Sequence, residues 1–168
     1  RILAEGWHER YGEAHAEPNC IRHAELSYPE GIDYKHCTLY VNLEPCSHYG
    51  KTPPCAELII RKGIGRVVIG TLDPNPQVAG RGVRMMREAG IDVIVGVMEK
   101  ECRELNKRFF CLQEKKRPYV VLKWAQTADG FIDIKRTGGS PLVISTPIMK
   151  QLVHEQRAKN MAIMVGTN

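Results

Sequence analysis

Residues 44–55 read EPCSHYGKTPPC, and the triplet His15-Ala-Glu17 lies upstream of them. One imidazole, from His15, and two thiolates, from Cys46 and Cys55, can bind a zinc ion and leave a fourth position open for water. Three protein ligands with an open position are typical of catalytic zinc, whereas structural zinc has four. The pattern therefore predicts a catalytic zinc centre, with Glu17 beside the metal but not bound to it.

The local sequence predicts a helix start next to each end of this pattern. We expect a helix at 14–26, in which Pro18 falls in the first turn, where its missing N–H has no partner to lose. A second helix, 54–62, is expected to follow Pro53 and to end at Gly63. The positive ends of two helix dipoles would then stabilise the charged ligands of one ion.

The residues around the predicted metal are those that hydrolytic deamination requires. Zinc lowers the pKa of its bound water from about 15.7 to about 7, which gives hydroxide at neutral pH. A carboxylate such as that of Glu17 can carry the proton from water to a ring nitrogen, and such acid–base catalysis contributes about 10²–10⁴-fold. The pattern H-x-E…P-C…C is the signature of zinc deaminases.

The four other cysteines have a structural interpretation. Cys102 shares one face of an expected helix with Leu105, Phe109 and Leu112, which predicts a core position. Six cysteines could form three disulfides, but the sequence shows neither a signal peptide nor a hydrophobic span. We therefore expect reduced thiols and a cytoplasmic protein.

Composition supports a globular enzyme that takes an anionic ligand. The chain has 168 residues, of which 43% are hydrophobic, so it can bury a core in one or two domains. Its net charge of +5 suits phosphates. Its basic residues are scattered, so neither a nucleic-acid surface nor a membrane surface is indicated.

Strands and helices alternate along the chain, which predicts an α/β fold with a parallel or mixed sheet covered on both faces. Residues 114–118 resemble a linker. Residues 1–6 are expected to be half of a hairpin, and 161–165 a strand just before the end of the chain, so we expect a fragment of a longer protein. The expected strands are 38–43, 66–72, 92–97, 119–124 and 161–165, and the further expected helices are 81–89, 99–114 and 147–158, with a turn at 129–130.

The run at 44–55, with HAE upstream and Asp73-Pro-Asn75-Pro downstream, resembles the bifunctional deaminase–reductase family of riboflavin biosynthesis. Nucleoside, nucleic-acid and guanine deaminases typically carry P-C-x-x-C, and the longer gap between the cysteines here points away from them. Residues 122–130, LKWAQTADG, are similar to the opening strand of that family's reductase domain.

The resemblance implies a cytidine-deaminase-like three-layer α/β/α domain at 1–115. It also implies the start of a dihydrofolate-reductase-like α/β domain at 116–168. The substrate would be 2,5-diamino-6-(5-phosphoribosylamino)pyrimidin-4-one, which is deaminated to the uracil analogue. One zinc would serve the deaminase domain, and NADPH would serve a reductase that converts the ribosyl group to ribityl. The implied protein is a homo-oligomer.

The resemblance also assigns residues that bind the substrate and the cofactor. In the deaminase part the substrate-binding residues would be His8, His48, Lys51, Asp73 and Asn75. The sequence at 73–76 is equally a good turn. In the reductase part, Ser140 and Arg157 would bind substrate, and Ala125, Leu142, Ser145 and Thr146 would contact the cofactor. Many relatives carry Trp where Leu142 stands, which is a departure at the cofactor site.

Two other functions remain open at this point. The chain could deaminate another substrate, such as a nucleoside or a tRNA adenosine, although a P-C-x-x-C spacing and a basic face are both missing. It could instead be a non-catalytic, zinc-stabilised module. A module of that kind would have a fourth protein ligand, for which His48 is the nearest candidate, or would lack the carboxylate.

Overall fold

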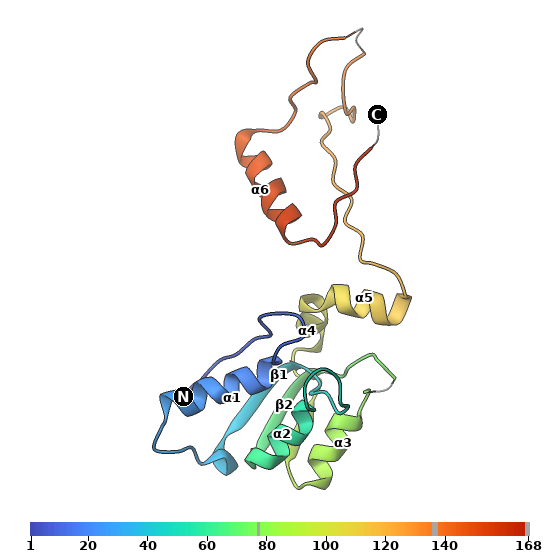
Figure 1. The fold of residues 1–168 in the computed structure, drawn as a ribbon. Coiled ribbons are helices and arrows are strands. Elements are labelled where there is room, and N and C mark those ends of the chain that lie inside the picture. Colours follow the sequence, from blue (N-terminus) through green and yellow to red (C-terminus); the bar gives the residue numbers. More distant parts are fainter. Residues whose placement is uncertain (77, 136–137, 167–168) are drawn as a thin grey trace. The chain divides into compact units, whose positions relative to one another are not determined.

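The computed structural model describes residues 1–76, 78–135 and 138–166. The chain divides into two compact units, Arg1–Tyr119 (unit 1) and Val120–Asn168 (unit 2). Among the described residues of unit 2, α6 is the one regular element (Figure 1). The elements are α1 (Ala16–Ser27), a 3₁₀ turn (Tyr34–His36), β1 (Thr38–Leu43), α2 (Cys55–Lys62), β2 (Arg66–Thr71), α3 (Arg81–Glu88), β3 (Asp92–Val95), α4 (Glu99–Leu105), α5 (Lys107–Lys115) and α6 (Pro147–Ala158).

Unit 1 is built on a parallel sheet with the strand order β1-β2-β3. Val67 of the central strand β2 pairs with Leu39 of β1 and with Val93 of β3. Every residue of β2 after Arg66 is buried, as expected for a strand that is covered on both faces. The structure confirms the predicted strands at 38–43, 66–72 and 92–97, with slightly earlier ends for the last two.

Helices cover both faces of this sheet. Side chains alternate along β2, so Val67 and Ile69 face one side of the sheet and Gly70 faces the other. Val67 and Ile69 belong to a core cluster with residues from three helices. On the other side, Cys102 of α4 lies against Gly70, where a Cβ would be 2.2 Å from the Cys102 Sγ. The predicted three-layer α/β/α arrangement is therefore confirmed (Figure 1). The helical residues of the cluster include Ile21 of α1, Ala56 and Ile59 of α2, and Val83 and Met86 of α3.

The single helix predicted at 99–114 is wrong, because α4 and α5 are separate helices with Asn106 between them. The side-chain amide of Asn106 donates to the carbonyl oxygen of Cys102 at 3.0 Å. Local side-chain bonds of this kind are typical of asparagine, and here the Cys102 carbonyl also accepts the backbone N–H of Asn106 at 3.2 Å. Leu105 and Leu112, which the sequence placed on one buried face with Cys102, are exposed.

The hairpin strand predicted at 1–6 is also not a strand in the structure. This segment lies against α1. Its carbonyl groups bond to side chains of the helix, since Ala4 accepts from the thiol of Cys20 and Glu5 accepts from the ring of His23. These contacts take the place of the hydrogen bonds that a neighbouring strand would supply.

In unit 2, the predicted helix 147–158 is confirmed as α6. It begins after Thr146, whose hydroxyl oxygen accepts the backbone N–H of Met149 at 3.3 Å. Pro147 occupies its first position, where a missing N–H costs nothing. The predicted turn at 129–130 is confirmed as well, since the N–H of Gly130 donates to the carbonyl of Thr127.

The strands predicted at 119–124 and 161–165 are not strands among the described residues. A strand exists only when a second strand satisfies its backbone groups, and the described part of unit 2 contains no ladder. The apolar side chains of Val120, Val121 and Leu122 are accordingly exposed. Within the described ranges, no helix combines the length and the apolar character that crossing a membrane requires.

Candidate metal centre

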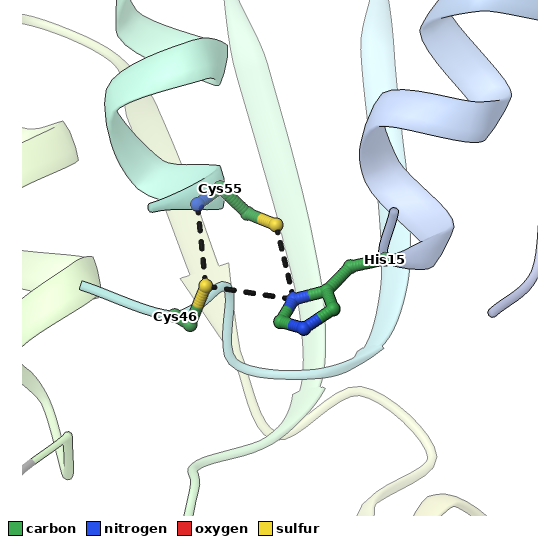
Figure 2. A group of neighbouring side chains, drawn as sticks. All are labelled: His15, Cys46 and Cys55. Carbon is green, nitrogen blue, oxygen red and sulfur yellow. Dashed lines mark hydrogen bonds between the residues drawn. The ribbon is translucent and has the colours of Figure 1, made fainter. Parts of the chain in front are cut away.

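Three potential metal donors converge at one edge of unit 1. His15 directly precedes α1, Cys46 follows β1, and Cys55 is the first residue of α2 (Figure 2). The Nδ1 of His15 lies 3.6 Å from the Cys46 Sγ and 3.4 Å from the Cys55 Sγ. All three donor atoms lie within 4.8 Å of one another.

The spacing of these donors fits a zinc ion. Zinc bonds of about 2.0–2.1 Å to nitrogen and about 2.3 Å to sulfur, at tetrahedral angles, place nitrogen about 3.6 Å from sulfur. The two distances observed here agree with that value. In the described ranges, this is the group of histidine, cysteine and acidic side chains that could hold a metal, and it supplies three donors. A tetrahedral ion would keep a fourth position for water.

The prolines of the 44–55 stretch set the position of Cys55. Pro54 is the N-cap of α2 and its ψ of 132° is not helical, so the helix starts at Cys55 itself. The first backbone N–H groups of a helix have no partner within it. Here the N–H of Cys55 donates to the Cys46 Sγ at 3.3 Å, and that of Ala56 donates to the Cys46 carbonyl at 3.1 Å. The start of α2 thus binds the loop that carries the other cysteine.

The two thiols share a proton unequally. The hydrogen bond from Cys55 lowers the pKa of Cys46 to about 5, although partial burial opposes this shift. The pKa of Cys55 is raised, first because its thiol donates to Cys46 and second because it is buried. At neutral pH the pair therefore holds one thiolate and one thiol. Binding a metal through both sulfurs releases the remaining proton.

Glu17 lies beside the donors and is buried, with 8% of its surface exposed. It occupies the first turn of α1, two residues after His15. Burial raises its pKa, while its hydrogen bond with Cys55 acts in the opposite direction. A carboxyl group with a raised pKa can accept a proton and release it again near neutral pH, which is what a proton shuttle must do.

Two other predicted site residues, His8 and Lys51, make ring contacts with residues of the segment before α1. The His8 ring packs edge-on against the His15 ring, with centroids 5.5 Å apart, and its Nδ1 bonds to the Ala14 carbonyl. The ammonium group of Lys51 lies 4.0 Å from the centre of the Tyr11 ring. The segment before α1 therefore meets the loop that joins the two cysteine donors in the sequence.

Asp73, Asn75 and His48 form a second set of predicted site residues. Asp73 follows β2, and its carboxylate accepts the backbone N–H of Asn75 at 2.8 Å. Partial burial raises the pKa of Asp73, and the nearby charge of Glu44 adds to the rise, while His48 opposes it. Asp73 and Asn75 thus form the turn that the sequence also allowed, at the edge where parallel sheets usually bind ligands.

The predicted reductase residues belong to unit 2, and the structure does not gather them around one point. Thr146 caps the start of α6, whereas Arg157 lies in its last turn. With a rise of about 1.5 Å per residue, these two positions are about 16 Å apart along the helix. Ser140 and Leu142 are exposed, and Ala125 and Ser145 are half-buried.

Sequence reasoning missed two residues that contact predicted site residues, Glu44 and Tyr11. Glu44 is 3% exposed and its carboxylate accepts three backbone N–H groups. A carboxylate directly after a predicted strand was the available signal, because a charge that becomes buried there needs partners. Tyr11 contacts Lys51 through its ring, which no sequence spacing reveals.

A parallel sheet between helices, with one histidine, two cysteines and a buried glutamate at helix starts, defines the class of cytidine-deaminase-like zinc proteins. The model of the cytidine and deoxycytidylate deaminase zinc-binding region matches residues 1–71, and that of the RibD C-terminal domain matches residues 118–168. The chain belongs to the RibD family, the deaminase–reductases of riboflavin biosynthesis.

Individual relatives agree over nearly the whole chain. RibD of Aquifex aeolicus is 46% identical over 168 residues, which are all of this chain and 45% of that protein. A diaminohydroxyphosphoribosylamino-pyrimidine deaminase of Buchnera aphidicola is 50% identical over 66% of this chain and 71% of its own length. The crystal structure of the Thermotoga maritima deaminase/reductase is 48% identical with a TM-score of 0.80, over 94% of this chain and 43% of that one. The chain thus spans less than half of the first relatives it matches.

Proposed function

We propose that this protein catalyses a step of riboflavin biosynthesis. The step is the zinc-dependent hydrolytic deamination of 2,5-diamino-6-(5-phosphoribosylamino)pyrimidin-4-one to the corresponding uracil. The observation that carries the proposal is the buried Glu17 beside one imidazole and two thiol donors at zinc-compatible distances. The match to a relative named for this deamination, over most of that relative's length, supports the choice of substrate.

The reaction replaces an exocyclic amino group by oxygen, with water consumed and ammonia released. Zinc, when bound by His15, Cys46 and Cys55, supplies an activated water. Glu17 accepts a proton from this water and delivers it to the ring nitrogen next to the carbon under attack. A second proton goes through the same carboxyl group to the departing amine, which leaves as ammonia. The raised pKa of Glu17 suits both transfers.

We assign substrate binding to the residues around the centre. His8 packs on His15 and so lies where a flat ring would enter. Lys51 carries a positive charge at the opposite loop and suits the phosphate. Asp73 and Asn75, with His48 nearby, are assigned to the ribose phosphate arm, because they follow the central strand at the ligand-binding edge of the sheet.

For the domains, we propose that 1–115 form the deaminase and that 116–168 begin an NADPH-dependent reductase. Ala125, Leu142, Ser145 and Thr146 would then contact the cofactor, and Ser140 and Arg157 the substrate. These residues do not make a nicotinamide site by themselves, because Thr146 and Arg157 lie at opposite ends of α6. A reductive activity would need further residues.

We also propose a cytoplasmic homo-oligomer that acts on a small molecule and on neither nucleic acid nor membranes. None of the six cysteines is in a disulfide bond, which suits a reducing compartment. The net charge of +5 is modest and suits a phosphorylated substrate.

The test is ammonia release from the diaminopyrimidinone phosphate, with the chain expressed at its natural length and loaded with zinc. Glu17→Gln is expected to keep one zinc per chain and to lower kcat by about 10²–10⁴-fold, because the shuttle is lost. No ammonia from a zinc-loaded wild type would contradict the proposal and favour another substrate or a structural zinc module. Unchanged kcat in the variant would remove Glu17 from the mechanism.

A further inference from the structure

Glu44 is a buried carboxylate for which the reaction above has no use. It follows the last residue of β1 and precedes Pro45 and Cys46 in the chain. Its own N–H donates to the Thr71 carbonyl at 2.9 Å, so it extends the pairing of β1 with β2. A buried ionised group is costly unless its hydrogen bonds are complete, and therefore its partners indicate what it does.

Within the part of the chain that the structure describes, the partners of this carboxylate are three backbone N–H groups from beyond β2. Oε2 accepts from Asp73 at 3.3 Å and from Gly80 at 2.9 Å. Oε1 accepts from Val83 at 3.3 Å. Asp73 begins the turn that carries Asn75, and Gly80 is the N-cap of α3. One side chain thus binds both the substrate turn and the start of α3.

Close backbone packing reinforces this connection. Gly82, in the first turn of α3, approaches the chain directly before the metal donor Cys46. A Cβ at Gly82 would lie 2.3 Å from the Pro45 carbonyl oxygen and 3.3 Å from the Glu44 Oε1. The start of α3 therefore packs against the segment that directly precedes Cys46.

We infer that Glu44 is a positioning residue that fixes the substrate turn, with Asp73 and Asn75, relative to the metal donor Cys46. The inference rests on the proposed function, because it takes that turn as the binding site of the ribose phosphate arm. Glu44 touches neither the substrate nor the metal in this role. It sets the distance between the place where the arm is held and the place where the ring reacts.

Glu44→Gln tests this role because it keeps the shape and changes the hydrogen bonding. An amide has one acceptor oxygen, and its NH₂ group must face at least one of the three backbone N–H groups. At least one of the three hydrogen bonds is then lost, which weakens the connection between the turn and the start of α3. In the zinc-loaded protein at its natural length, we expect unchanged zinc content, a KM for the substrate raised about tenfold and a kcat within about threefold of wild type. Hydrogen exchange at the amides of Asp73, Gly80 and Val83 should become faster.

A double-mutant cycle with Asn75→Ala separates positioning from a general loss of stability. If Glu44 acts through the turn, Glu44→Gln should raise KM much less in the Asn75→Ala background than in the wild type. Glu101→Gln, an exposed change of the same chemistry on α4, is the matched control and should leave KM unchanged. If Glu44→Gln does not fold, Glu44→Asp replaces it, since it keeps the charge but shortens the reach.

Three results would overturn the inference: a KM unchanged in Glu44→Gln, a loss of zinc, or effects on KM that simply add in the cycle. Faster exchange with an unchanged KM would mean that Glu44 serves only the fold. Failure of the proposed function would look different, because the wild type itself would then release no ammonia from this substrate.

Discussion

The two units of this chain contain the same kinds of local signal but differ in what those signals build. In unit 1, the apolar strand β2 lies between two others and is buried. In unit 2, residues 120–122 are just as apolar, yet no described residue pairs with them and their side chains are exposed. Both units also contain a helix that begins at a proline signal, α2 and α6. The difference shows that a helix can be specified locally, whereas a strand depends on its neighbour.

The helix starts of the two units differ in their use as well. At α2, the free N–H of Cys55 donates to the Cys46 sulfur, so the helix end becomes part of the metal centre. At α6, the free N–H of Met149 donates to the side chain of Thr146, and the helix end is closed by its own cap. A helix end serves a site only when another segment brings a ligand to it.

The largest effect is expected from a metal donor. Cys55→Ser should lose zinc and lower deaminase activity by more than about 100-fold, since even indirect partners of metal ligands cost 10–100-fold. Hydrogen exchange should become faster throughout the start of α2 and remain unchanged in α6. Metal analysis with exchange measurements checks this. Cys37→Ser, at a thiol outside the centre, is the control, and an equal loss of zinc there would contradict the assignment.

Matched truncations of aliphatic side chains compare how tightly α2 of unit 1 and α6 of unit 2 are packed. Ile59→Ala removes a fully buried side chain of α2 and should lower the free energy of unfolding of unit 1 by about 2–5 kcal/mol. Leu152→Ala on α6 changes a side chain that is 46% exposed and should cost within about 0.5 kcal/mol. Urea unfolding, monitored by hydrogen exchange in each unit, measures both changes in the free energy of unfolding. Equal costs would mean that α6 is packed as tightly as α2.

The smallest effect concerns the reactivity of Cys46 in the zinc-free protein. A thiolate is the reactive form, and the pKa of Cys46 is lowered to about 5 by the hydrogen bond from Cys55. Alkylation at Cys46 should therefore be nearly constant from pH 7 down to about 6, and should then fall about tenfold per pH unit below about 5. Peptide mapping after iodoacetamide treatment measures it. Zinc should protect Cys46 from alkylation. An alkylation rate that rises only near pH 9 would contradict the lowered pKa of Cys46.

Much of unit 1 could be predicted from sequence because its signals are local and mutually consistent. The prolines before Cys55 and the glycine after Lys62 bound α2 as expected. The short apolar runs gave the three parallel strands. The division of the 99–114 helix was missed because it occurs at one residue, Asn106, whose side-chain amide donates to the Cys102 carbonyl.

The sequence by itself determined the donor set, the neighbouring carboxylate and the alternation of strands and helices, since residue type and short spacing are enough for these. Only the tertiary structure decided that residues 1–6 lie against α1, that three backbone groups surround Glu44, and that the Cys46 sulfur accepts from the start of α2. The physical reason is that backbone N–H and carbonyl groups are the same at every residue. Their partners depend on which segments meet in space, and residue type and spacing do not specify which segments meet.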